Sequence, residues 1–194
     1  MSRRLSYYCV NILKCYANID EEDTDIYQFG IEMIIMHIFH FVIMMLVGII
    51  LKKPKETLAF IMIYSKMRTT AGGQHFKSKG LCFGSSVGLI MIVMCPIKIK
   101  NLMYLLQWKW TFFLLLCGIL CICMLAPCDN INKPMDNIEK EEYRKQAISM
   151  TCVFAFIYLA SVYAYPIIGY IIAISFFLEG VGLVWGTVQN RKVQ

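Results

Sequence analysis

The sequence predicts an all-α polytopic membrane helix bundle with about six membrane segments, preceded by an amphipathic helix at the N-terminus. Of its 194 residues, 58% are hydrophobic and only 16% are charged, which is more apolar than an ordinary water-soluble domain. The apolar residues also gather in long runs, such as residues 31–51 and 111–126, and these are close to the length that crosses about 30 Å of hydrocarbon. We therefore expect residues 1–194 to form a single integral membrane domain.

Residues 3–19 predict a helix that lies on the membrane surface. Leu5, Tyr8 and Ile12 recur at helical spacing, while basic and amide side chains occupy the other faces. Such a helix either anchors the protein and packs against it, or docks a partner and helps to shape a site.

Six apolar segments follow, and each is expected to cross or enter the membrane. They are residues 31–51, 57–67, 81–97, 102–126, 147–165 and 167–188. The second segment has only 11 residues, so we expect it to thin the bilayer, to rely on its flanking lysines, or to remain a buried half-helix. A charged loop, residues 128–146, is expected before the last two segments, and Pro166 separates those two.

The distribution of basic residues predicts the orientation of the chain. With six crossings and both termini on the inner side, the inner segments contain 13 of the 19 lysines and arginines, and the outer segments contain five. Basic residues accumulate on the cytoplasmic side of membrane proteins, so we expect both termini and residues 68–80 to be cytoplasmic. No basic stripe interleaved with aromatic residues indicates nucleic-acid binding.

The polar segment formed by residues 68–80 carries the residue types needed for covalent catalysis. It contains His75, and Cys82 follows seven positions later, which on a continuous helix separates the two by about 10.5 Å of rise. A turn through residues 78–80 would bring them together, and Cys82 would then open the next helix, where the helix dipole and an imidazole both favour a thiolate. The alternative is a loop histidine and a cysteine that only packs.

Two motifs in the chain resemble those of a known family. Residues 71–75 have the sequence AGGQH, with Arg68 before them and Cys82 after them, and this is similar to the active-site motif of the accessory gene regulator B (AgrB) family. Residues 126–129 have the sequence APCD, with Lys133 shortly after, and this resembles the family's Ala-Pro-x-Asp motif. The order of apolar segments agrees with the family over essentially the whole chain.

The resemblance implies an activity in bacterial quorum sensing. AgrB proteins are membrane cysteine endopeptidases that remove the C-terminal tail of an AgrD propeptide through an acyl-enzyme thioester, which a peptide side chain then displaces to close a thiolactone or lactone ring. Carried over to this chain, Cys82 is the nucleophile and His75 is the base. The resemblance also implies a homodimer in the bacterial cell membrane, and neither a cofactor nor a metal is expected.

Further site residues are candidates with structural alternatives. Gln74 would donate to an oxyanion, and Asp129 would orient His75, unless it only caps a helix. The candidates for binding the substrate and its acidic tail are Arg68, Gly72, Gly73 and Lys133. The charges of Arg68 and Lys133 are also typical of residues that face solvent or lipid headgroups.

Two other functions compete with the peptidase interpretation. The polar residues Glu32, His37, His40 and Glu179 lie within apolar runs, and they would line a polar path if the protein were a small transporter or peptide exporter. Small residues at Gly180 and Gly182 are typical of helix contacts, so a scaffold that dimerises there is the third hypothesis.

Overall fold

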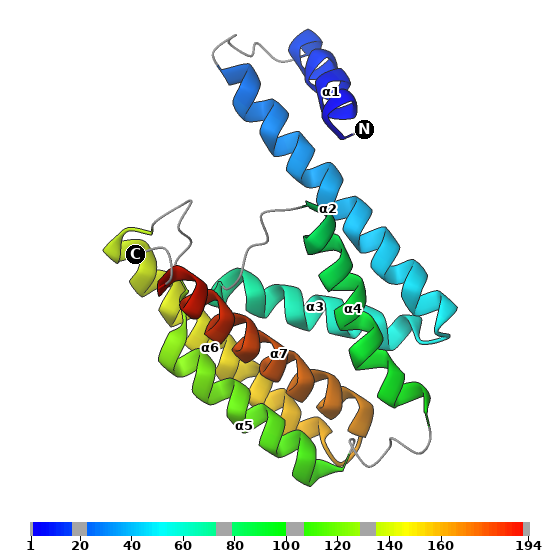
Figure 1. The fold of residues 1–194 in the computed structure, drawn as a ribbon, viewed down its shortest axis with the longest axis vertical. Coiled ribbons are helices and arrows are strands. Elements are labelled where there is room, and N and C mark those ends of the chain that lie inside the picture. Colours follow the sequence, from blue (N-terminus) through cyan, green and yellow to red (C-terminus); the bar gives the residue numbers. More distant parts are fainter. Residues whose placement is uncertain (1, 17–22, 73–78, 100–106, 129–134, 192–194) are drawn as a thin grey trace. The chain divides into compact units, whose positions relative to one another are not determined.

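The protein is all-helical, as the sequence predicts. The computed structural model describes residues 2–16, 23–72, 79–99, 107–128 and 135–191. Within these ranges the chain forms the helices α1 (Ser2–Tyr16), α2 (Thr24–Ile50), α3 (Pro54–Ala71), α4 (Lys79–Lys98), α5 (Trp108–Leu125), α6 (Asn137–Ser161) and α7 (Pro166–Arg191) (Figure 1). They divide into two compact units, residues 1–46 and 47–194.

The first unit contains α1 and most of α2. In α1 the side chains of Leu5, Tyr8 and Ile12 are exposed, which suits a helix whose apolar face lies on a membrane. The expected membrane segment 31–51 lies almost entirely in α2, a helix that begins earlier, at Thr24. Its first turn contains Asp25, whose negative charge favours the N-terminal end of the helix dipole.

Three of the described helices are long and apolar enough to cross a membrane. They are α2, α5 and α7, and they correspond to three of the six expected segments. The other expected segments lie in α3, α4 and α6, which do not combine sufficient length and apolarity within the described ranges. The structure therefore supports a membrane protein, while the expected count of about six membrane segments is not confirmed.

The expected short segment, residues 57–67, is part of a longer helix. Helix α3 has 18 residues and is about 27 Å long at 1.5 Å per residue. It begins at Pro54, because proline suits the first turn of a helix, where no backbone N–H is required. It continues as far as Ala71, so the first four residues of the segment expected to be polar and catalytic, residues 68–80, are helical.

The expected charged loop, residues 128–146, is also partly helical. Helix α6 begins at Asn137 with a capping box, in which the Asp136 carboxylate accepts a hydrogen bond from the Asn137 N–H at 2.9 Å and the Glu139 side chain accepts one from the Asp136 N–H at 3.4 Å. These caps satisfy N–H groups that the first turn leaves unpaired. The charged residues therefore form the first half of α6, and the expected segment 147–165 forms its apolar second half.

In the second unit, α5 and α7 run parallel to each other, and α6 runs antiparallel to both (Figure 1). The backbones of α5 and α7 approach closely at Gly118, where a Cβ atom would overlap the backbone of Phe176. The start of α5 is joined to the end of α6 by a buried hydrogen bond of 2.8 Å between the hydroxyls of Thr111 and Tyr158. Helix α3 packs against α6 and α7.

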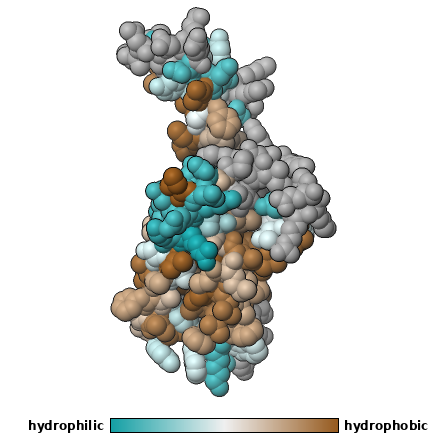
Figure 2. All heavy atoms as spheres, turned by 90° about the vertical axis from the view of Figure 1, so that its left-hand side faces the viewer, coloured by the Kyte–Doolittle hydropathy of each residue, from teal (hydrophilic) through white to brown (hydrophobic). Residues whose placement is uncertain are grey.

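The surface separates into apolar and polar regions. Figure 2 shows a broad hydrophobic surface below a hydrophilic patch. The first turns of α6, which contain Lys140, Glu141 and Lys145, are largely exposed. A helix bundle with an apolar outer surface and one polar end is typical of a protein that is partly embedded in a bilayer.

Candidate functional site

The described parts of the two sequence motifs, residues 71–72 and 126–128, lie side by side although they are far apart in the chain. Gly72 and Cys128 form an isolated parallel β-bridge, in which the N–H of Cys128 donates to the carbonyl oxygen of Ala71 at 3.0 Å. Ala71 is the last residue of α3, and Cys128 follows α5 after Ala126 and Pro127. The bridge therefore joins the end of α3 to the end of α5.

Glycine at position 72 is required by both its backbone conformation and its surroundings. Gly72 has a φ of +81° and ends α3, where its N–H donates to the carbonyl oxygen of Arg68 at 3.1 Å. A Cβ atom here would lie 2.7 Å from the carbonyl oxygen of Cys128, which is closer than real side chains approach a backbone. The glycine thus allows the two motifs to pair.

Replacing Gly72 with alanine is therefore expected to separate the two motifs. Backbone strain of this kind costs about 1 to 3 kcal/mol, and the clash with Cys128 adds to it. Thermal unfolding of the purified protein in detergent should show a clear loss of stability. Gly88→Ala is the matched control, because its Cβ would meet nothing within 4 Å; equal stability of both variants would contradict the described junction.

The end of α7 contacts the same junction. The Cys128 thiol is buried, and its Sγ lies 3.9 Å from the Thr187 hydroxyl oxygen, while the side-chain amide of Asn190 donates to it at 3.8 Å. Figure 1 shows the C-terminal ends of α3, α5 and α7 at one end of the second unit. Cys128 belongs to the APCD motif but had no role assigned from the sequence, and Thr187 and Asn190 were not predicted. The available signal for these two was a pair of polar residues about one turn apart at the end of an apolar helix.

Arg68, a candidate for binding the substrate, pairs with a residue of its own chain. Its Nη1 lies 4.0 Å from Oε2 of Glu179, whose side chain is fully buried. Gly182 leaves room for the guanidinium, since a Cβ there would lie 3.5 Å from Nη1. Glu179 therefore faces the bundle, because the arginine that it meets belongs to α3.

The small residues considered for a dimer contact also pack within the chain. A Cβ at Gly180 would lie 3.0 Å from the Cβ of Cys121 on α5 and 3.4 Å from the Cα of Gly118. Neither Gly180 nor the buried Glu179 therefore requires a second subunit. The homodimer remains an expectation that rests on the family resemblance.

The described structure contains only part of the predicted catalytic pair. Cys82 lies in the first turn of α4, which begins at Lys79, so residues 79 and 80 of the expected turn 78–80 are helical. The side chain of Cys82 lies outside the described structure, as do the predicted site residues Gly73, Gln74, His75, Asp129 and Lys133. The contact between Cys82 and His75 thus stays a prediction.

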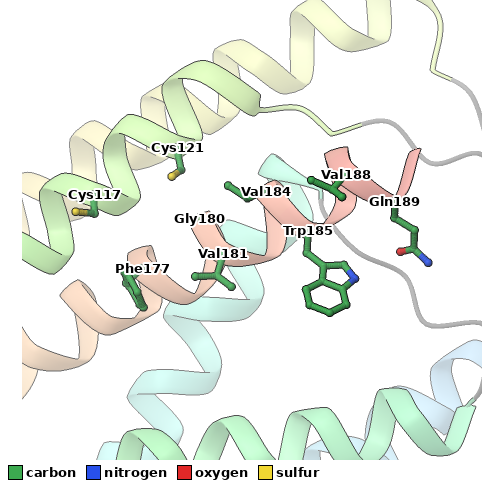
Figure 3. A pocket seen from close by; sticks show the side chains of 9 residues that line it. All are labelled: Cys117, Cys121, Phe177, Gly180, Val181, Val184, Trp185, Val188 and Gln189. Carbon is green, nitrogen blue, oxygen red and sulfur yellow. The ribbon is translucent and has the colours of Figure 1, made fainter. Parts of the chain in front are cut away.

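A separate groove runs between α5 and α7 (Figure 3). It has a volume of about 650 Å³, and its walls are almost entirely apolar. Cys117 and Cys121 project from α5, and the other lining side chains come from residues 177–189 of α7. Among the described residues, no acid, base or histidine lines this groove.

Comparison with known proteins identifies the family. Residues 6–183 match the family described as Accessory gene regulator B. The chain is 23% identical over 175 residues to AgrB-like proteins from two strains of Clostridium perfringens, covering 87% of this chain and 81% of each relative. It is also 23% identical over 146 residues to protein FsrB of Enterococcus faecalis, covering 73% of this chain and 60% of FsrB.

No solved structure matches the chain. The family match spans both motifs, the one that ends α3 and the one that follows α5, as well as most of α1 and most of α7. The chain therefore belongs to the accessory gene regulator B family, whose members act on AgrD-like propeptides in quorum-sensing systems.

Proposed function

We propose that this protein is a cysteine endopeptidase that removes the C-terminal tail of an AgrD-like propeptide and promotes its cyclisation. The observation that carries the proposal is the pairing of Gly72 with Cys128. It joins Gly72, which precedes His75 by three residues in the chain, to Cys128, which directly precedes Asp129, and this supports a composite active site. The family membership supports the same substrate class.

The proposed nucleophile is Cys82. Its position in the first turn of α4 favours a thiolate, because the N-terminal end of a helix carries a partial positive charge. The thiolate attacks the carbonyl carbon of the scissile peptide bond, and His75 then protonates the departing amine as the C–N bond breaks. The tail leaves, and the remaining peptide is held to Cys82 as a thioester.

Ring closure follows from the same thioester. A thiol of the peptide attacks the thioester carbonyl, its proton passes to the base, and the Cys82 thiolate is released as the leaving group. Exchange of one thioester for another changes little in bond energy, so exclusion of water is what protects the product from hydrolysis. A site at the edge of an apolar bundle favours this outcome.

Asp129 is the proposed orienting residue for His75. Asp129 follows the bridged Cys128 directly, while His75 is three residues beyond the bridged Gly72. At about 3.6 Å per residue at most, the chain allows His75 to be no more than about 11 Å from Gly72, and these short connections support the assignment. Gln74 is the proposed oxyanion donor on the same connection.

The remaining parts of the proposal concern the substrate and the membrane. Lys133 and the glycines at positions 72 and 73 are proposed to receive the substrate tail, whereas Arg68 is held by Glu179.

We propose a multi-pass protein of the bacterial cell membrane with both termini and the site on the cytoplasmic side. The distribution of basic residues supports this orientation.

Reconstitution tests the proposal directly. The purified protein in lipid vesicles is incubated with a synthetic AgrD-like propeptide that has an amphipathic leader, an internal cysteine and an acidic tail. Mass spectrometry should detect the free tail and a cyclic product lighter than the linear cleaved peptide by one water. Transport of the intact peptide across the vesicle membrane without cleavage would contradict the proposal and favour an exporter.

A further inference from the structure

We propose that Glu179 is a positioning residue for the reaction, because its buried carboxylate holds Arg68 and thereby fixes the end of α3 beside Cys128. This inference rests on the proposed function and goes beyond it by assigning a role to a residue outside both motifs. Glu179 lies near the middle of α7, the most deeply buried of the apolar helices.

The surroundings of Glu179 favour a role in holding Arg68 in place over a role in stabilising the helix bundle. Its side chain is fully buried, and within the described residues neither carboxylate oxygen accepts a hydrogen bond. The nearest cation is the Arg68 guanidinium, at 4.0 Å. Burying a carboxylate is costly, and a buried ion pair is often less stabilising than apolar residues of similar volume. The pair is thus better explained by the geometry that it fixes.

Arg68 connects Glu179 to the candidate site through the backbone of α3. Its carbonyl oxygen accepts the hydrogen bond from the Gly72 N–H that ends the helix, at 3.1 Å. The Tyr64 side chain, one turn earlier on α3, lies close to the same guanidinium. The residue whose side chain is held by α7 is therefore the same residue whose backbone holds Gly72.

Helix α7 also contacts the junction near its own C-terminal end. Thr187 and Asn190 lie against the Cys128 thiol, and Thr187 is about 12 Å along the helix from Glu179, at 1.5 Å per residue. One rigid helix thus holds the end of α3 through Glu179 and the residue after α5 through Thr187. Loss of the first contact should loosen the pairing of Gly72 with Cys128.

Small displacements of this junction should affect turnover more than binding. Gly72 is three residues before His75 in the chain, so movement of the end of α3 changes where the base lies. A misplacement of about 1 Å in a catalytic group can reduce the rate about 100-fold. We expect Glu179→Gln to lower kcat by about 10-fold to 100-fold with little change in KM.

A double-mutant cycle tests whether Glu179 acts through Arg68. Tail cleavage is measured for Glu179→Gln, Arg68→Gln and the double variant in vesicles, with Cys82→Ala as the background rate. Glu179→Gln should change kcat less than about twofold when Arg68 is already replaced, because residues that act as a unit are not additive. Losses that multiply in the double variant would overturn the proposal.

A matched control and an apolar pair separate positioning from folding. Ser175→Ala removes another fully buried polar group one turn earlier on α7, whose hydroxyl donates only to the Ile171 carbonyl of the same helix, and it should leave kcat within about twofold of the parent. The double variant Arg68→Met/Glu179→Met should fold, since apolar replacement of a buried pair is tolerated, yet remain slow. Full activity of this folded variant would overturn the proposal.

Alkylation of Cys128 provides a readout that does not depend on cleavage. This thiol is 8% exposed, so N-ethylmaleimide should modify it slowly in the parent protein and several-fold faster in Glu179→Gln, but not in Ser175→Ala. Equal rates in all three would overturn the positioning role whatever the activity. If alkylation is faster in Glu179→Gln but Cys82→Ala does not reduce tail cleavage, the described junction is correct and the proposed function is wrong.

Discussion

Tail cleavage should be lost when Cys82 is replaced with alanine, while the protein inserts at normal abundance. Alanine has no nucleophilic atom, so neither the thioester nor the ring can form through this site. We expect cleavage to fall by at least about 1000-fold, as for other covalent nucleophiles. The measurement is the mass of the released tail, with the amount of inserted protein determined in the same samples.

Two related variants separate the nucleophile from the base. His75→Ala should be almost as inactive, because an unassisted thiol with a pKa of about 8.5 is mostly protonated at neutral pH. Cys82→Ser should also be severely impaired, since a hydroxyl is harder to deprotonate and yields an ester in place of a thioester. Activity of Cys82→Ser close to that of the parent would contradict the thioester chemistry.

Other cysteines provide the controls for this series. Cys117 lines the apolar groove on α5, and Cys123 is exposed on the same helix. Alanine at either position should retain turnover, because these thiols act as small apolar side chains. If alanine at Cys123 reduced cleavage as strongly as alanine at Cys82, the assignment of the nucleophile would be wrong.

Substitution of Gly118 with leucine should have the largest effect on stability. A Cβ atom at this position already overlaps the backbone of Phe176, and a backbone cannot move aside as a flexible side chain can. Helices α5 and α7 would have to separate, which disrupts the main contact of the second unit. We expect a loss of at least about 3 kcal/mol, at the upper end of overpacking effects, and little folded protein.

The control for this substitution is another helical glycine with free space. A Cβ at Gly84 of α4 would meet nothing within 4 Å, so Gly84→Ala should leave thermal unfolding unchanged or slightly raised, since alanine favours a helix over glycine. Retention of the parent melting temperature by Gly118→Leu would contradict the close approach of α5 and α7.

The sequence was sufficient to predict where helices occur, but not where several of them end. Helices α2, α5 and α7 could be predicted because each coincides with a long apolar run in the sequence. The ends of α3 and α6 were wrong because local effects extend these helices into charged sequence: Pro54 starts α3, and the capping box at Asp136 starts α6. Charged residues are good helix formers, so charge alone does not indicate a loop.

Only those parts of the candidate site that belong to a sequence motif could be predicted. The motif residues drew attention to Gly72 and to the segment after α5, but the sequence does not show that these two segments pair. The pairing depends on a positive φ at Gly72 and on the packing of both α3 and α5 against α7. The partner of Glu179 was equally hidden, because a buried ion pair between distant helices leaves no local spacing in the sequence.

Trapping of the acyl-enzyme tests the central claim most directly. A propeptide whose internal cysteine is replaced with alanine cannot close the ring, so the thioester should accumulate on the enzyme. Intact mass spectrometry should show an enzyme heavier by the mass of the peptide without its tail, located at Cys82 and removed by hydroxylamine. An adduct on another residue, or tail release by the Cys82→Ala variant at the parent rate, would contradict the account.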